Sequence, residues 1–347
     1  MIRIAILSLL LLLGKTNLQF FPANNAYLQY TGRLDVTDPT APKAWSPGVY
    51  MQCTIEGTSV GIILEDQHQY NANYNYISIA IDQQAPIRVQ MKQVVDTLFV
   101  HNLPKGKHHI TVCKSTEGNI GYIIFKGILA EKLLPSPPKP SRKIEYYGNS
   151  ITCGTGSDQS VIPCGKGAWH DQHNAYMSYG PLTARALHAQ WQLSAVSGIG
   201  LMHSCCNIGI TMPEVFDKIN MRENKLDWDV NLYQPDVVTI ALGQNDGIQD
   251  STIFSNRYAD FLRTMRSKYP KSTFVLLNSP MADPSLANFL SKNMQALVQR
   301  LHEEDSNIYT YTFKKRYHAG CDDHPSLVEH TQIAAELTAF IKHMKHW

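Results

Sequence analysis

A proline-rich stretch divides this chain of 347 residues into two parts whose hydrophobic residues follow different periods. The stretch is LLPSPPKPSRK, residues 133–143. Proline fixes φ and lacks a backbone N–H, so a segment of this composition is stiff and extended. We therefore predict a linker here, with one domain before it and another after it.

Before the linker, the sequence alternates as β-strands do. YISIAID, residues 76–82, places its three isoleucines on one face, and PIRVQMK repeats that spacing. Turn-forming residues separate further short runs, which are VYMQCTI, SVGIILED, DTLFVHNL, HITVC and GYIIFKGILAE. Many short strands with little helical pattern predict an antiparallel β-sandwich over residues 21–132.

After the linker, strand-like runs alternate with amphipathic helical patterns. The strand-like runs are KIEYYG, WQLSAVS, PDVVTIALG, STFVLLNSP and NIYTYTF. The helical patterns are SNRYADFLRTMRSKY, SLANFLSKNMQALVQRL and TQIAAELTAFIKHM. This alternation predicts an α/β domain over residues 144–347, with a parallel sheet and helices on both faces. In such folds, reactive groups gather in loops beyond the carboxyl ends of the strands.

The N-terminus has the pattern of a secretory signal. Arg3 precedes an apolar run from Ile4 to Leu13. The run is shorter than the roughly 20 residues that a membrane-spanning helix needs, and it suits the apolar region of a signal peptide. We predict a signal peptide over residues 1–20, a secreted protein (extracellular or periplasmic), and no membrane association after signal removal.

Charge and cysteine content narrow the partners and the compartment. The net charge of +2 is too small to indicate a nucleic-acid partner. Seven cysteines fit an oxidising compartment, and their odd number leaves at least one outside intramolecular disulfides. A bond between the neighbours Cys205 and Cys206 is expected to be strained. The chain lacks the CxxC spacing that is typical of zinc sites.

Two histidines lie close together in WHDQH, residues 169–173. Loop histidines are far more often solvated or hydrogen-bonded than bound to metal, so we predict no metal site here. From its position in the same loop, Trp169 is a candidate platform for a sugar ring.

Four strand-to-loop junctions carry residues that could do chemistry together. Ser150 follows KIEYYG, a strand in AVSGIG ends in glycine, Asn245 follows TIALG, and His324 lies before the last helix. Taken singly, these residues are explained as well or better by turns, caps or solvated surface. Their occurrence at successive carboxyl ends instead predicts a hydrolytic site. In it, Ser150 is the nucleophile, His324 the general base and the Asn245 amide an oxyanion donor.

The segments that carry these residues resemble the SGNH (GDSL-like) hydrolase superfamily, and within it carbohydrate esterase family 2, the acetylxylan-esterase-like enzymes. They are YYGNSITCGTG, AVSGIGLM, TMPEVFDKI, QPDVVTIALGQND and GCDDHPSLVEH. The first domain is also similar, through YTGRLD, WSPGVYMQCTIEGTSVGIIL and ISIAIDQ.

The resemblance implies a jelly-roll domain followed by a flavodoxin-like α/β/α esterase domain. It implies removal of O-acetyl groups from acetylated polysaccharides or oligosaccharides such as xylan and glucomannan, without a metal or organic cofactor. It places the oxyanion hole at the backbone N–H groups of Ser150 and Gly198 and the side chain of Asn245, and Gly200 matches less well.

Two positions depart from the superfamily pattern. Asn149 stands where an aspartate commonly precedes the serine, and Cys321 stands three residues before His324, where an aspartate is usual. Asp322 is therefore a candidate for the acid that orients His324. A backbone carbonyl is an equal alternative, because it also accepts the Nδ1 proton and fixes the tautomer.

Two other functions remain open at this stage. The secreted two-domain layout and the many aromatic residues also suit a non-catalytic glycan-binding protein, although such a protein needs neither Ser150 nor His324. The same catalytic residues also suit an esterase that acts on a lipid or thioester acyl group, which would need an extended apolar groove.

Overall fold

The computed structural model describes residues 17–347. Residues 1–16, most of the predicted signal peptide, lie outside the described residues. The last part of that prediction overlaps the first strand, in which Gln19 and Phe20 pair with Ala130 and Leu129.

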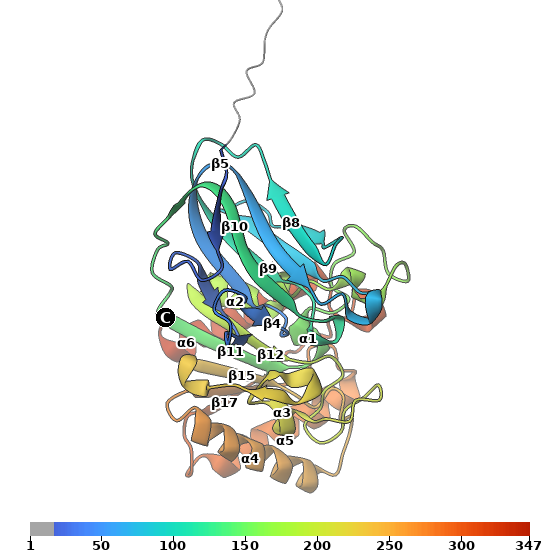
Figure 1. Cartoon of the computed structure of the whole chain (residues 1–347). Helices are drawn as coiled ribbons and strands as arrows, with labels where there is room; N and C mark the ends of the chain where they lie inside the picture. The colour runs from blue at the N-terminus through green and yellow to red at the C-terminus, as the bar shows by residue number, and fades with distance from the viewer. Residues whose placement is uncertain (1–16) are drawn as a thin grey trace, which may run out of the picture.

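The first domain is a single antiparallel sheet of ten strands that folds over one core (Figure 1). Its strands are β1 (Gln19–Pro22), β2 (Gln29–Thr31), β3 (Leu34–Asp35), β4 (Lys43–Ala44), β5 (Tyr50–Asp66), β6 (Tyr76–Ile81), β7 (Ile87–Gln90), β8 (Val95–Val100), β9 (Gly106–Lys114) and β10 (Ile123–Leu134). Isoleucines of β5, β6 and β9, among them Ile62, Ile79 and Ile110, fill the core.

Strand β5 corrects one sequence-based expectation. The runs VYMQCTI and SVGIILED were expected to form two strands, but both belong to this one strand of 17 residues. Residues 50–57 of β5 pair with β9 and residues 60–65 pair with β8. One strand therefore serves both layers of the sandwich. Gly57 is the last residue of β5 that pairs with β9, and it has a φ of +153°, which glycine tolerates best.

The second domain is built on a five-stranded parallel sheet with the order β12-β11-β15-β16-β17. These strands are β11 (Arg142–Gly148), β12 (Ala189–Ala195), β15 (Val237–Ala241), β16 (Thr273–Leu277) and β17 (Ile308–Tyr311), and β13 (Lys218–Asn220) and β14 (Lys225–Asp227) form a separate hairpin. The order is the flavodoxin-like 2-1-3-4-5, whose switch point lies between β11 and β15. Ligands of such folds bind at the carboxyl ends of the strands beside this point.

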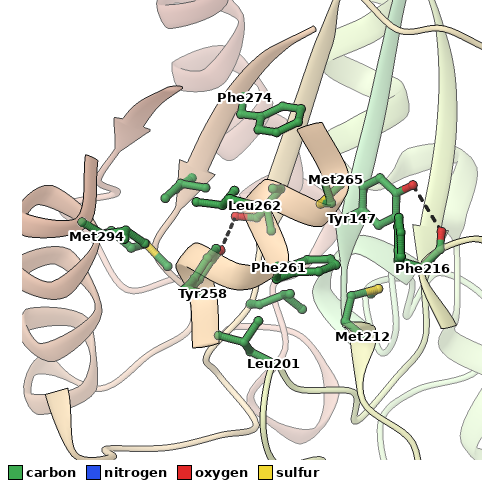
Figure 2. Packing of buried hydrophobic residues seen from close by; sticks show 14 of the residues in the cluster. Tyr147, Leu201, Met212, Phe216, Tyr258, Phe261, Leu262, Met265, Phe274 and Met294 are labelled. Carbon is green, nitrogen blue, oxygen red and sulfur yellow. Dashed lines mark hydrogen bonds between the residues drawn. The ribbon is translucent and has the colours of Figure 1, made fainter. Parts of the chain in front are cut away.

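Helices cover both faces of the parallel sheet, as the sequence predicts. They are α1 (Ser150–Cys153), α2 (Tyr179–Ala186), α3 (Met212–Val215), α4 (Ser251–Lys268), α5 (Pro284–Leu301) and α6 (Leu327–Lys345). Helices α3, α4 and α5 share one apolar cluster with the sheet. Figure 2 shows Phe261, Leu262 and Met265 of α4 in this cluster, beside Tyr147 of β11 and Phe274 of β16.

The opposite face packs against α2, α6 and the first domain (Figure 1). Tyr50 of β5 stacks on Trp191 of β12, with ring centroids 3.9 Å apart. A fully buried ion pair also crosses the interface, in which the Arg33 guanidinium lies 2.8 Å from Glu145 Oε1. The two domains therefore share a core.

The irregular part of the predicted linker is shorter than expected. Because β10 ends at Leu134 and β11 begins at Arg142, only residues 135–141 lie outside strands. This segment is held to the first domain, since Ser136 Oγ donates to the Tyr27 carbonyl and Pro137 accepts from Gln29 Nε2, each at 3.1 Å.

Candidate active site

Ser150 is the first residue of α1, at the carboxyl end of β11. The Asn149 side chain caps this short helix by accepting the Ile151 N–H at 3.2 Å. Asparagine and aspartate cap helices about equally well, so an amide at position 149 serves without a charge. At a helix N-terminus the Ser150 N–H has no acceptor within its own helix and remains available to a ligand.

His324 lies within hydrogen-bond distance of Ser150, with 2.8 Å between Nε2 and Oγ. The other ring nitrogen, Nδ1, is 2.9 Å from the Asp322 carbonyl and 3.2 Å from the Cys321 carbonyl. Carbonyl oxygens only accept, so Nδ1 carries the proton and Nε2 is free to accept from the serine hydroxyl. This is the tautomer that a general base requires.

Of the two supports left open for His324, the carboxylate or a backbone carbonyl, the structure has the carbonyl of Asp322 at the ring, and the Asp322 carboxylate does not orient it. Asp322 has a φ of +52°, and this left-handed conformation turns its carbonyl toward the ring while its side chain is exposed. Gly320 N also donates to the His324 carbonyl at 2.7 Å.

A disulfide anchors the segment that supports His324. Cys321 is bonded to Cys164, with the two Cα atoms 5.2 Å apart. The Cys321 N–H donates to the Gly156 carbonyl at 2.8 Å, which ties the same residue to the loop that follows Ser150. Cys321 thus holds the histidine loop against the serine loop.

Burial sets the protonation state of the histidine. It lowers the pKa of His324, and the hydrogen bonds to the carbonyls of Asp322 and Cys321 oppose this shift in part. The ring is therefore neutral at pH 7, as a proton acceptor must be.

Gly198 and Asn245 face the same cavity as Ser150 and His324. Gly198 has a φ of +83°, and its N–H has no hydrogen-bond acceptor within residues 17–347. Asn245 Nδ2 donates to the Ile199 carbonyl at 2.8 Å, which leaves its second N–H free. Gly200 is unsuited to the same task because its N–H already donates to Ser204 Oγ at 3.1 Å.

Two buried carboxylates that the sequence analysis did not single out shape this region. Asp246 accepts the N–H groups of Leu201, Met202 and His203 at 2.6–3.0 Å and so fixes the loop after Gly198. Because Asp246 directly follows Asn245, the sequence alone could have identified it as a candidate site residue. Glu117, from the first domain, accepts the Ser197 N–H at 2.8 Å, and no local pattern marks it.

The cavity has a volume of about 320 Å³. Its walls include Trp169 and a disulfide between the neighbours Cys205 and Cys206, which is present despite the strain expected of such a bond. Arg222 also lines the cavity, and Asn119 extends the wall from the first domain.

The histidines of WHDQH were expected to be solvated or hydrogen-bonded, and the structure rules out the first of these. His170 and His173 are both buried, and burial lowers the pKa of each ring. Within residues 17–347, no group of three or more His, Cys, Asp or Glu side chains is arranged to hold a metal ion.

Comparison with known proteins finds two family models along the chain. The model described as carbohydrate esterase 2 N-terminal matches residues 30–137, and that of the GDSL-like lipase/acylhydrolase family matches residues 146–338. The second match alone covers more than half of the chain and shows the GDSL-like family, and the first match assigns the chain within it. The chain belongs to carbohydrate esterase family 2. It is thus a carboxylic ester hydrolase of the SGNH superfamily.

Known relatives of this family 2 esterase are carbohydrate esterases. An acetylxylan esterase / glucomannan deacetylase of Cellvibrio japonicus is 28% identical over 336 residues, which are 94% of this chain and 91% of the relative. The cellulase/esterase CelE of Acetivibrio thermocellus is 30% identical, but the match spans only 40% of its length.

The fold agrees with a solved structure of the same family. A family two carbohydrate esterase from Clostridium thermocellum in complex with cellohexaose superposes with a TM-score of 0.83 at 28% identity, covering 92% of this chain and 99% of the other. Among residues 17–347, none of the helices combines the length and the apolar composition of a membrane span.

Proposed function

We propose that this esterase removes O-acetyl groups from plant polysaccharides or their oligosaccharides, such as xylan and glucomannan, through an acetyl-serine intermediate. The observation that carries the proposal is the 2.8 Å contact between Ser150 Oγ and a neutral His324, in a cavity that Gly198 and Asn245 also face. Acetylated xylan and glucomannan are suggested by the name of the Cellvibrio relative, and binding of a polysaccharide chain by the cellohexaose of the Clostridium structure.

In the first half of the reaction, His324 Nε2 accepts the hydroxyl proton as Ser150 Oγ attacks the acetyl carbonyl carbon. The resulting oxyanion is stabilised by the N–H groups of Ser150 and Gly198 and by the free N–H of Asn245. The C–O bond to the sugar then breaks, and the sugar oxygen leaves with the proton from His324.

In the second half, water takes the place of the sugar. His324 accepts a proton from the water as its oxygen attacks the acetyl carbonyl, and the proton returns to Ser150 Oγ when acetate leaves. The ring bears its positive charge only transiently. The carbonyls of Cys321 and Asp322 hold it in place, so the site works as a Ser–His dyad.

Substitution of Asn245 tests whether its side chain belongs to the oxyanion hole. We expect Asn245→Ala to lower kcat by about 100-fold or more, because an oxyanion donor acts mainly in the transition state. Turnover of an aryl acetate with KM measured alongside checks this. A variant with unchanged kcat would show that the Asn245 amide is not a donor.

The central test is acetate release from acetylated xylan, acetylated glucomannan and an aryl acetate by wild type and Ser150→Ala. We expect wild-type turnover that the variant loses. If Ser150→Ala keeps the wild-type rate, the assignment of the nucleophile is wrong.

Acyl-chain length separates this proposal from a lipid or thioester esterase. We expect acetyl aryl esters to be turned over faster than octanoyl aryl esters, as the name of the acetylxylan esterase relative suggests. A strong preference for octanoyl would contradict the acetylesterase function. Glycan binding without turnover on any acylated sugar would instead favour a non-catalytic binding protein.

The proposal includes export and a two-domain organisation. A signal peptide at the N-terminus, a β-sandwich that ends near residue 132 and a catalytic domain over residues 144–347 fit a protein that acts on extracellular polysaccharide. N-terminal sequencing of the exported protein tests the first of these assignments.

A further inference from the structure

The loop of the first domain that follows β9 reaches into the catalytic domain beside the active site. Glu117 of this loop is 1% exposed, although it carries a carboxylate. Its Oε2 accepts the Ser197 N–H at 2.8 Å and its Oε1 accepts the Ser197 hydroxyl. A single buried carboxylate therefore binds both donors of the residue that precedes Gly198.

We propose that Glu117 is a positioning residue for the oxyanion hole, so that the first domain is part of the catalytic apparatus. The inference rests on the proposed function, in which the Gly198 N–H stabilises the oxyanion.

The direction of the Gly198 N–H depends on its anchors, because glycine has more backbone freedom than any other residue. On the C-terminal side, the Gly198 carbonyl accepts the Cys205 N–H at 2.9 Å, and the Ile199 carbonyl accepts from Asn245 at 2.8 Å. On the N-terminal side, Glu117 holds Ser197 by both its backbone and its side chain. Loss of Glu117 would remove both of these bonds and leave Ser197 Oγ with Thr155 Oγ1 as its partner.

The contact between Glu117 and Ser197 is also linked to Ser150, whose N–H is the second backbone donor of the site. Ser197 Oγ lies 2.9 Å from Thr155 Oγ1, and the Thr155 N–H donates to the Ser150 carbonyl at 3.0 Å. One chain of hydrogen bonds thus runs from Glu117 through Ser197 and Thr155 to Ser150. A displacement of well under 1 Å at such donors matters, because a misplacement of about 1 Å can cost 100-fold in rate.

The loop that carries Glu117 is itself fixed. The buried Lys114 ammonium donates to the carbonyls of Thr116 and Glu117 at 2.7 and 3.2 Å, and Ala175 of the catalytic domain donates to the Ser115 carbonyl at 3.0 Å. Burial raises the pKa of Glu117, whereas the hydrogen bonds from Ser197 and the charges of Arg222 and Lys114 lower it. Burial also lowers the pKa of Lys114 to about 7, so Arg222 is the neighbouring group that stays positively charged near the Glu117 carboxylate.

The first domain supplies a matched control. Glu131 Oε1 also accepts a backbone N–H and a hydroxyl from one residue, Thr58, at 2.7 and 2.9 Å. Both residues belong to the first domain and neither lines the active-site cavity. Glu131→Gln should therefore leave kcat unchanged.

The experiment compares Glu117→Met, Glu117→Gln and Glu131→Gln with wild type on an aryl acetate. Methionine keeps the volume without an acceptor, and we expect kcat to fall by about 10- to 100-fold with little change in KM. Glutamine keeps one acceptor oxygen, so it should recover part of that loss and remain about fivefold below wild type. Inhibition by methylboronic acid, whose adduct on Ser150 mimics the tetrahedral intermediate, should weaken in parallel with kcat.

A purely structural role predicts a different result: a lower Tm with wild-type kcat and wild-type boronic-acid affinity in the folded fraction. Wild-type kcat and boronic-acid affinity in folded Glu117→Met would overturn this inference but leave the proposed function intact. If Glu117→Met does not fold, the same result for Glu117→Gln would do so. A wild type without Ser150-dependent turnover overturns the proposed function, and this inference with it.

Discussion

His324 receives its support from backbone carbonyls, and this makes the neighbouring carboxylates dispensable. We expect Asp322→Asn to retain kcat within about twofold, because the substitution leaves the carbonyl in place. In serine protease triads, where a buried carboxylate does orient the base, the same change costs about 10⁴-fold. Steady-state kinetics on an aryl acetate decide between the two, with the exposed Asp323→Asn as control.

The pH dependence of the reaction follows from the burial of the same ring. Because burial lowers the pKa of His324 below the usual 6.5, the neutral base persists to lower pH than an exposed histidine would. We expect kcat/KM to stay high as the pH falls to 6.5 and to decline only below it. A profile measured between about pH 4.5 and 8 checks this, and an acid midpoint above 6.5 would contradict it.

Among single residues of the site, the sequence predicted those that directly follow strands of the parallel sheet. It missed those that come from distant parts of the chain. Ser150, Asn245 and the glycine of AVSGIG come at carboxyl ends of neighbouring strands, so the topology alone predicts that they meet. Glu117 contacts Ser197 across 80 residues of sequence, and no local period marks such a contact. The choice between carboxylate and carbonyl for His324 depended on the backbone conformation of Asp322, which sequence does not show.

Among the structural elements, the loop between β17 and α6 depends on one covalent bond. The Cys164–Cys321 disulfide joins residues 157 apart in sequence, and Asp322 and Asp323 beside it both have positive φ. We expect Cys164→Ser/Cys321→Ser to lower the free energy of unfolding by about 2–5 kcal/mol, since the unfolded chain gains freedom. It should also lower kcat, because the carbonyl support of His324 loosens.

Urea unfolding and aryl acetate turnover of the double variant measure both effects. Cys205→Ser/Cys206→Ser is the control for stability, because a bond between neighbours closes no loop and its loss should change the unfolding free energy little. If the Cys164/Cys321 double variant is as stable and as active as wild type, the loop between β17 and α6 keeps its conformation without the disulfide.

Element types were predictable where a long period ran without interruption. The pattern SLANFLSKNMQALVQRL coincides with α5 to within one residue, and all five strands of the parallel sheet were expected. The prediction was wrong for β5 because Gly57 resembles a turn signal between two runs. In the sheet, that glycine lies within one continuous strand, as the last residue paired with β9 before the segment paired with β8.

For the whole molecule, the proline-rich stretch predicted two domains, and the structure shows how closely they are joined. Arg33 of the first domain donates to Glu145 Oε1, the Tyr147 hydroxyl and the Lys218 carbonyl at 2.7–2.8 Å. In a catalytic domain that folded alone, Glu145 would lack the guanidinium with which it forms a buried ion pair. The first domain therefore completes the second, both at this ion pair and, on our inference, at the oxyanion hole.

This buried pair leads to a prediction for the stability of the molecule. Removing one partner of a buried ion pair costs about 3–5 kcal/mol, because the other charge stays buried without compensation. We expect Arg33→Met to destabilise the protein by that amount, and Arg33→Met/Glu145→Gln to recover part of the loss because the stranded charge is gone. Because the domains share a core, wild type should unfold in a single calorimetric transition with equal van't Hoff and calorimetric enthalpies. Two separate transitions in wild type would show that the domains unfold independently. A double variant no more stable than Arg33→Met would show that the uncompensated charge of Glu145 does not cause the loss.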